Sequence, residues 1–492
     1  MSMHILKKFL PLIILVIYFG LQLPFLKADP DTVVDINTRG AWTDEGLYAS
    51  QVKNLVNHGT FDLKENSTFV RGPVFNIIQL PFFLIFGTSL LVARLITIML
   101  TLFVLFLFLK EKKLWNFSVF LLLFVLLEFH IFQFTHYAMV EMMCVDFIML
   151  GLLFFLKTEN NFSLRTNLPK IFLASLFMFL CYGAKIQYLY VAAILPITSF
   201  FNALVLSVKE RKIKWQHYSN FTWFFVFSVG FVLTYYFLWY IPNKEFYDFV
   251  MSNESGGRYG ATFVSIRRDA LFNWIHVFFV SEYKVFIVHF FVILALAIVL
   301  FIAKKKKTIH SQIALFSFIW IIIELHKVPM LYLPNRYIIS LFFASGVFIS
   351  SFYSALDIYF KKIKLLIFAI AIAFGIYNLS FYKDAMERKS YQLVAINEYL
   401  SNYDLKERPV IGAWASSFCW QNKAVTFPVW NNYFNWKDPV KSFKPSLVIS
   451  ETNEAESDNS YKSQNIDLNK LSDSIRTFDV WRYKINVFWI RN

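Results

Sequence analysis

Apolar runs of about 20 residues recur along most of this chain, and they decide what it can fold into. As an α-helix, a run of that length crosses the roughly 30 Å hydrocarbon core of a bilayer. The chain is also 57% hydrophobic, with 59 phenylalanines among its 492 residues, well above a soluble domain. We therefore expect an α-helical polytopic membrane protein with about eleven spanning helices. These are predicted at residues 9–25, 89–109, 117–134, 137–156, 171–183, 188–206, 221–241, 285–303, 313–325, 337–355 and 365–382.

The location of the positive charge decides what the net charge of +15 means. If the N-terminus lies inside, basic residues far outnumber acidic ones in the inner loops, which is the positive-inside pattern of membrane proteins. The excess is thus a topology signal, and nucleic acid is excluded as a partner. We expect a plasma (inner) membrane protein with a cytoplasmic N-terminus and an extracytoplasmic (periplasmic) C-terminal domain. The inner basic residues are Lys7, Lys8, Lys110, Lys112, Lys113, Lys157, Arg165, Lys170, Lys209, Arg211, Lys212, Lys214, Lys304 to Lys307, Lys361, Lys362 and Lys364.

The outer segments divide the chain into two predicted domains. Residues 1–382 form the transmembrane domain, whose first outer loop, residues 27–87, carries two surface helices. The first has Thr43 or Asp44 as N-cap, an apolar stripe at helical spacing and Gly59 as its stop. It is predicted to lie on the membrane surface. The second, residues 73–86, is too short to cross by itself.

Residues 383–492 have an ordinary soluble composition. A helical pattern at residues 391–400 precedes short apolar runs at 410–414, 424–430, 447–450 and 480–490, which are separated by turn residues. This pattern predicts a small α/β domain on the outer face.

Charged residues gather at the outer ends of the predicted helices. Such residues are costly near a membrane and can form a site when helix ends bring them together. Carboxylates that accept a proton and cations that hold a phosphate leaving group are what transfer from a phosphate-linked donor requires. Structural roles stay open for each, as helix cap, headgroup anchor or satisfied histidine. The group comprises Asp44, Glu45, Arg71, Glu141, Lys185, His276, Lys327 and Arg336; Glu128, Asp146 and Glu324 are interpreted as helix-to-helix hydrogen-bonding groups.

The order of several short motifs resembles the GT-C superfamily of polytopic glycosyltransferases. The nearest branch includes the aminoarabinose transferases that act on lipid A and relatives of the protein O-mannosyltransferases. Trp42-Thr-Asp44-Glu45-Gly-Leu-Tyr48-Ala is similar to the family's Asp-Glu-x-x-Tyr-Ala, and Arg71-Gly-Pro73-Val-Phe to its Lys-Pro-Pro-Leu-x-Tyr. The set continues with Phe86-Gly leading to Arg94-Leu, His136-Tyr-Ala-Met-Val-Glu141, Gly183-Ala-Lys185 and Leu333-Pro-Asn-Arg336-Tyr337.

The resemblance implies transfer of a sugar from a polyprenyl-phosphate carrier to an envelope acceptor, which is lipid A or core, a glycan or a protein. It implies Asp44 as the base, with Glu45 and Glu141 as further catalytic carboxylates. Arg71, Lys185 and Arg336 would bind the donor phosphate, and His276 and Tyr337 are additional candidates. No cofactor is assigned. A divalent metal stays possible, but the acid that precedes the basic residue in the family is Val70 here, which counts against the family's metal site.

A physical argument points the same way. Nucleotide sugars stay in the cytosol, so a transferase with its acids outside needs a donor delivered through the membrane. A transporter or flippase for a lipid-linked substrate is the main alternative, but transporters usually carry repeated halves and midplane polar features, and this sequence has no detectable repeat. A non-catalytic envelope assembly protein is the second alternative. It leaves the ordered acidic and basic positions unexplained.

Overall fold

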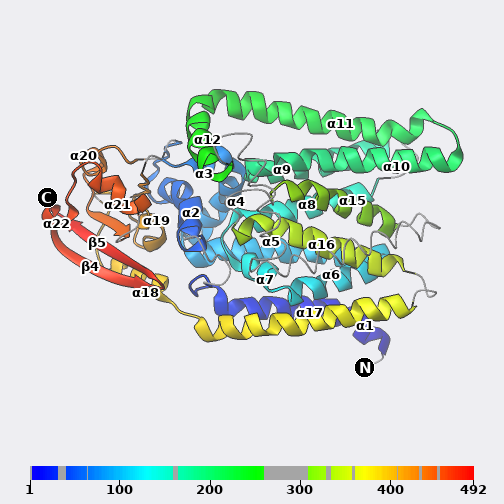
Figure 1. The fold of residues 1–492 in the computed structure, drawn as a ribbon, viewed down its shortest axis with the longest axis horizontal. Coiled ribbons are helices and arrows are strands. Elements are labelled where there is room, and N and C mark those ends of the chain that lie inside the picture. The colour runs from blue at the N-terminus through cyan, green and yellow to red at the C-terminus, as the bar shows by residue number, and fades with distance from the viewer. Residues whose placement is uncertain are drawn as a thin grey trace.

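The structure of the chain is a computed structural model. It describes residues 3–31, 40–63, 65–158, 164–259, 309–327, 334–356, 361–406, 408–431, 435–451 and 455–491. Long helices lie side by side, and a small sheet domain sits at one end of them (Figure 1). The N-terminus lies toward the other end of the helical bundle. The predicted span at 285–303 and His276 fall outside the described residues.

Seven described helical segments are long and apolar enough to cross a membrane, or up to eight if one bent pair forms a single span. The chain is thus a multi-pass membrane protein, as its apolar runs predicted. The helices of the bundle are α1 (Met3–Gln22), α5 (Leu90–Lys110), α6 (Trp115–Leu127), α7 (Phe129–His136), α8 (Val140–Leu156), α9 (Leu164–Ala184), η3 (Ile186–Ala193), α10 (Ile194–Glu210), α11 (Trp215–Tyr235), α15 (Ile309–Glu324), α16 (Asn335–Ala355) and α17 (Lys361–Arg388). Short turns η1 (Leu23–Phe25), η2 (Lys112–Leu114), η4 (Tyr236–Tyr240), η5 (Ile241–Asn243) and η7 (Leu325–Lys327) and helix α12 (Lys244–Tyr259) join them.

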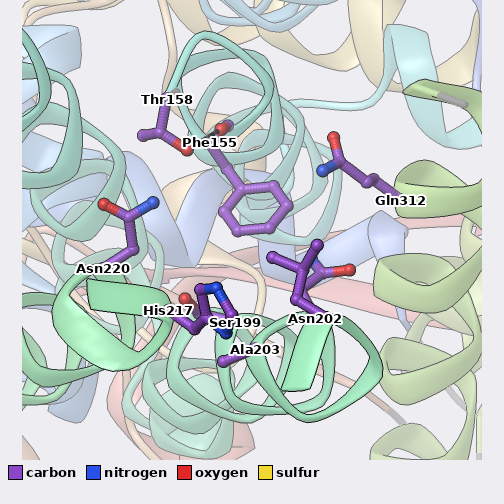
Figure 2. Close-up of a pocket in the computed structure, with 9 residues that line it drawn as sticks. Phe155, Thr158, Ser199, Asn202, Ala203, His217, Asn220 and Gln312 are labelled. Atoms are coloured by element: carbon purple, nitrogen blue, oxygen red, sulfur yellow. Dashed lines mark hydrogen bonds between the residues drawn. The ribbon is translucent and has the colours of Figure 1, made fainter. Parts of the chain in front are cut away.

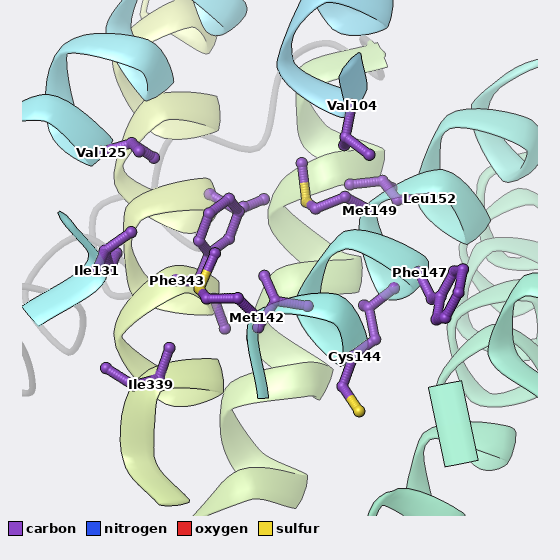
Figure 3. Close-up of a cluster of buried hydrophobic side chains, with 14 of the residues drawn as sticks. Val104, Val125, Ile131, Met142, Cys144, Phe147, Met149, Leu152, Ile339 and Phe343 are labelled. Atoms are coloured by element: carbon purple, nitrogen blue, oxygen red, sulfur yellow. The ribbon is translucent and has the colours of Figure 1, made fainter. Parts of the chain in front are cut away.

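Helix α8 is the centre of the bundle. Nearly all of its side chains are buried, because α5, α9, α15 and α16 pack around it. Figure 3 shows its Met142, Cys144 and Phe147 among side chains of neighbouring helices, including Ile339 and Phe343 of α16. Asp146 accepts a hydrogen bond from Thr101 Oγ1 at 2.8 Å, the helix-to-helix role predicted for it. Glu141 in the first turn of α8 is therefore carried by a helix that is buried along almost its whole length.

The predicted span at residues 117–134 is wrong in one respect: it is two helices, α6 and α7, bent by 83°. Glu128 lies at the break. Its carboxylate accepts from the Ile131 amide at 2.6 Å and so caps α7, while Asn378 of α17 accepts from the Phe129 amide at 3.2 Å. A buried N-cap that satisfies the freed amides makes the break tolerable inside the membrane domain. Glu128 is thus a cap rather than a bond between helices.

Helix α2 (Ala41–His58) carries the acidic pair and ends at Gly59, as predicted. The predicted N-cap is wrong: the helix begins at Ala41 after Gly40, whose φ of 40° suits glycine, and Asp44 lies inside the first turn. The helix does not lie open on a surface, since most of its residues are buried. A Cβ on Gly46 would come within 2.6 Å of the Ser417 amide nitrogen, so the backbones of α2 and α19 (Ala415–Phe418) are in contact.

Helices α3 (Ser67–Arg71) and α4 (Pro73–Phe86) follow, and α4 has the predicted bounds. Gly72 separates them. A Cβ there would lie 1.8 Å from the carbonyl oxygen of Ala184, so only glycine allows this close approach. The segment that holds Arg71 therefore packs against the segment that holds Lys185.

We call the part of the chain after α17 the tail domain. Its helices are α18 (Gln392–Ser401), α19, α20 (Pro439–Phe443), α21 (Ala455–Lys462) and α22 (Leu468–Leu471). Its strands are β1 (Val410–Ile411), β2 (Thr426–Phe427), β3 (Leu447–Glu451), β4 (Ser472–Val480) and β5 (Tyr483–Ile490), in the sheet order β2-β1-β3-β5-β4. The first three strands are parallel, and β5 runs antiparallel to β3 and β4. This is the predicted α/β domain, with β4 as a strand that the apolar pattern missed, because it is a mostly exposed edge strand.

Candidate active site

The two acids of the first outer loop point to different surroundings. A helix turns by about 100° per residue, so Asp44 shares a face with Tyr48, four residues on, and Glu45 does not. Glu45 is buried and faces Arg94 of α5, which is also buried. Arg94 donates from Nε to Oε1 at 2.8 Å and from Nη2 to Oε2 at 2.6 Å, a bidentate pair.

This bidentate pair fixes the start of α2. Glu45 Oε1 also accepts from the Ala138 amide at 2.6 Å. Arg94 Nη1 donates to the carbonyls of Phe25 at 2.8 Å and of Ala28 at 2.6 Å. The pair therefore ties α2 to α5, to η1 and the residues after it, and to the link between α7 and α8, and it leaves Asp44 on a different face of the helix.

Asp44 faces Arg336, the second residue of α16. Arg336 Nη2 lies 3.4 Å from Asp44 Oδ2, and the side chains are 7% and 15% exposed. Asp44 keeps more exposure than Glu45 or Glu141, so it is the most accessible of these three carboxylates. Its place in the first turn also puts it near the positive end of the α2 dipole, which favours the ionised form.

Glu141 and Lys185 form the second pair of the site. Lys185 Nζ donates to Glu141 Oε1 at 2.5 Å, with side chains 11% and 0% exposed. Burial lowers the pKa of the Lys185 amine, but the Glu141 carboxylate, Tyr48 and Tyr337 raise it by more, so the pKa lies above its ordinary value. Lys185 is thus a permanent cation at the break between α9 and η3.

Tyr337 joins the two pairs. Lys185 Nζ lies 4.9 Å from the centre of its ring and the Arg336 guanidinium lies 5.3 Å from it, both within cation–π range. Tyr48 lies close enough to the same charged groups for them to act on its hydroxyl. Burial raises its pKa above the ordinary value, and Lys185, Glu141, Asp44 and Arg336 are the charges that act on it. Five predicted residues and Tyr48 therefore form one cluster, which we call the charged cluster: Asp44, Glu141, Lys185, Arg336, Tyr337 and Tyr48.

Arg71 borders the charged cluster through the backbone. The contact between Gly72 and Ala184 brings the end of α3 against the residue before Lys185. Arg71 Nε donates to the Ser67 carbonyl within its own helix at 3.3 Å, and its side chain is only partly buried. A partly buried guanidinium beside the cluster can still reach an anion.

The carboxylates of the charged cluster do not fit a metal site. Among the described residues, no three His, Cys, Asp or Glu side chains come together as metal ligands. Asp44 and Glu141 instead each pair with a cation, which leaves them poorly placed as a shared ligand set.

Arg94 and Tyr48 stand in motifs of the sequence but received no predicted role in the site. Arg94 lies in an apolar span, and a buried arginine there needs a carboxylate partner, so the sequence could have marked Arg94 but not the acid that it meets. Tyr48 follows Asp44 by four residues on a predicted helix, and that spacing places both on one face.

A polar pocket lies at the opposite end of the bundle and is separate from the charged cluster. Phe155, at the end of α8, lines it, and Glu141 begins that helix about 21 Å away along its axis. Figure 2 shows the lining side chains around this pocket. They are Phe155, Thr158, Ser199, Asn202, Ala203, Leu206, His217, Asn220 and Gln312.

No protein-family model and no curated protein matches the sequence, but solved structures match the fold. ArnT from Cupriavidus metallidurans bound to undecaprenyl phosphate matches with a TM-score of 0.58 at 12% identity, over 97% of both chains. Its apo form gives 0.54 at 13% identity, over 91% of this chain and 95% of that chain. An Archaeoglobus fulgidus oligosaccharyltransferase tethered with an acceptor peptide gives a TM-score of 0.51 at 11% identity, over 91% of this chain and 69% of that chain. The chain therefore has the GT-C fold, as its motifs predicted.

Proposed function

We propose that this protein is a membrane glycosyltransferase that moves a sugar from a polyprenyl-phosphate carrier to an envelope acceptor on the outer face. One observation carries the proposal. A partly exposed carboxylate, Asp44, lies beside Arg336, and the ring of Tyr337 links Arg336 to the second cation, Lys185, in a protein with the GT-C fold. The ArnT structure with undecaprenyl phosphate supports a lipid phosphate as the donor group.

The proposed reaction is a single displacement. The acceptor hydroxyl gives its proton to Asp44, its oxygen bonds to the anomeric carbon, and the bond from that carbon to the phosphate oxygen breaks. The electron pair leaves with the polyprenyl phosphate, whose developing charge is stabilised by Arg336, Lys185 and Arg71. Attack from the side opposite the leaving group inverts the anomeric configuration.

The other predicted residues take supporting roles in this proposal. Glu141 holds Lys185 at 2.5 Å and is itself too buried to meet a substrate. Glu45 fixes α2 through Arg94 instead of touching the sugar. Tyr337 supports the two cations with its ring. His276 keeps its predicted place as a further candidate.

We propose that the charged cluster and the tail domain lie on the outer face of the plasma (inner) membrane. The predicted domains, residues 1–382 and 383–492, meet within the last part of α17, just before the tail domain. The acceptor would then approach from the side of the tail domain, which packs directly on α2. The donor would enter from the bilayer between the helices.

The test is product formation by the purified protein. A synthetic polyprenyl-phosphate sugar is mixed with envelope lipids, glycans or glycoproteins from cells that lack the chain, and products are identified by mass spectrometry. We expect a sugar-bearing product with inverted configuration and released polyprenyl phosphate. Transport of the labelled lipid across proteoliposomes without any product would instead support the flippase alternative.

A further inference from the structure

A buried ion pair beside the charged cluster takes no part in the chemistry proposed above. Glu324 ends α15 and Lys327 ends η7, three residues further on. Lys327 Nζ lies 2.8 Å from Glu324 Oε2, and the side chains are 8% and 0% exposed. A buried pair of this kind is weak evidence for added stability, since removing its charges from water costs about as much as their attraction returns. Its contacts show what else it does.

The Glu324 carboxylate ties together three elements. Its Oε1 accepts hydrogen bonds from the Tyr190 hydroxyl of η3, from Ser340 Oγ of α16 at 2.6 Å and from Trp320 Nε1 of α15 at 3.3 Å. Helix η3 begins directly after Lys185, and α16 begins with Asn335 and Arg336. One carboxylate therefore joins the two elements that carry the candidate phosphate-binding cations.

The Lys327 ammonium holds the residue between those cations. It donates to the backbone carbonyl of Tyr337 at 3.1 Å and lies 4.2 Å from the centre of the Tyr188 ring. The ring of Tyr337 in turn lies within cation–π distance of Lys185 and Arg336. Lys327 thus fixes the backbone of Tyr337, and the ring of Tyr337 contacts both cations.

We propose that Glu324 and Lys327 are positioning residues of the donor-phosphate site. They set the distance between Lys185 and Arg336 by holding η3 and the first turn of α16 around Tyr337, and they do so without touching the donor. This inference rests on the proposed function. It adds two residues to the site that act at a distance from the reacting atoms.

The experiment separates positioning from simple structural support. The double variant Glu324→Gln/Lys327→Met leaves no charge unpaired, whereas either single variant would leave one buried charge without its partner. Lys383→Met/Glu387→Gln is the matched control, since this pair on α17 is exposed, at 73% and 64%, with its charges 3.8 Å apart. For each protein we would measure the unfolding temperature and the affinity for undecaprenyl phosphate in detergent.

We expect the double variant to bind undecaprenyl phosphate at least about tenfold more weakly than wild type while it unfolds within a few degrees of it. The control should match wild type in both measurements. Lys327→Arg keeps a charge for Glu324 and an N–H for the Tyr337 carbonyl, so its affinity should stay within about threefold of wild type.

Two results would overturn the inference while leaving the proposed function intact. One is a double variant whose affinity stays within about twofold of wild type, well below the effect of a lost charge-assisted contact. The other is a double variant that does not fold, together with a Lys327→Arg variant that binds undecaprenyl phosphate as weakly as that unfolded protein does. If wild type itself does not bind the lipid phosphate, the proposed function fails first and the positioning inference falls with it.

Discussion

At the scale of single residues, the acidic pair shows how one turn of helix separates two roles. Asp44 faces Arg336 at the edge of the charged cluster, and Glu45 faces Arg94 in the interior. A carboxylate that takes up a proton needs access to the acceptor, whereas a buried bidentate partner is already committed. Replacing each acid by its neutral amide should therefore affect the protein in a different way.

Asp44→Asn should remove turnover and leave the fold intact. Loss of a general base costs about 10²- to 10⁴-fold in rate, and asparagine is nearly isosteric with aspartate. The measurement is the turnover of purified protein with a saturating polyprenyl-phosphate sugar, together with its unfolding temperature. An Asp44→Asn protein that works within about threefold of wild type would remove Asp44 from the catalytic role, since that change is far below a general-base effect.

Glu45→Gln should reduce stability. Arg94 would keep a buried charge without its carboxylate, and breaking one side of a buried pair typically costs about 3–5 kcal/mol. Thermal or denaturant unfolding in detergent measures this loss, with Asp44→Asn as the control that should show little of it. If Glu45→Gln unfolds like wild type and yet transfers no sugar, Glu45 is catalytic, as its motif implied.

Which residues belong to the site could be predicted, but their pairing could not. The motifs found Asp44, Glu141, Lys185 and Arg336, because a charge near the membrane stands out against an apolar background. Pairing depends on contacts between distant parts of the chain. Glu45 and Arg94 are 49 positions apart, and the fold alone decides that they meet.

At the scale of elements, α2 connects the membrane domain to the tail domain. Ser417 Oγ donates to the carbonyl of Thr43, next to Asp44, at 3.2 Å, and Lys53 Nζ donates to the carbonyl of Cys419 at 2.5 Å. Asn54 exchanges hydrogen bonds with the backbone of Thr426 at 3.0 and 3.2 Å. The tail domain therefore helps to set the position of the helix that carries Asp44.

The membrane-spanning helices were predictable because a bilayer requires a minimum length of apolar residues to cross it. The apolar runs of the sequence therefore follow the helices of the structure closely. The break at Glu128 was not predictable, since the apolar run continues through it and one carboxylate cap decides the bend. The interface of α2 was missed for a similar reason. Its polar residues Gln51, Lys53 and Asn54 suggest solvent, yet they are buried against the first outer loop and the tail domain.

Glu65 should make stability depend on pH at this junction. Burial raises the pKa of its carboxyl from 4.5 to about 8, although hydrogen bonds from Asn54 and Ser50 and the charge of Lys53 lower it. The folded state thus keeps a proton that the unfolded state releases between those values, so this contribution is complete below pH 4.5 and is lost as pH rises through 8. Burial lowers the pKa of Lys53 to about 8, so the contribution of Lys53 to stability rises with pH above that value.

Unfolding temperatures at about pH 5 and about pH 8 measure the effect of Glu65, since its pKa shift spans that window. Glu65→Gln, which resembles the protonated form and can still accept from Asn54, should show a smaller fall between the two values than wild type does. Equal falls in both proteins would mean that Glu65 does not titrate in this window.

At the scale of the whole molecule, the charged cluster lies at the end of the bundle that bears the tail domain, and the N-terminus lies toward the other end (Figure 1). This polarity agrees with the charge pattern of the loops, which predicts the basic loops inside. It matters for the chemistry. If the charged cluster lies on the outer face, as proposed, it has no access to nucleotide sugars, and its donor would arrive on a membrane lipid.

Cysteine labelling tests this orientation in intact cells. The native cysteines Cys144, Cys181 and Cys419 are all buried, so they should not react with a membrane-impermeant thiol reagent. Single cysteines at the exposed positions Thr60 and Asn459 should react, after permeabilisation of an outer membrane if one is present, and a cysteine at exposed Lys212 should react only after the cells are lysed. The reverse pattern would put Asp44 in the cytosol, where a nucleotide sugar could serve directly, and the need for a lipid-linked donor would disappear.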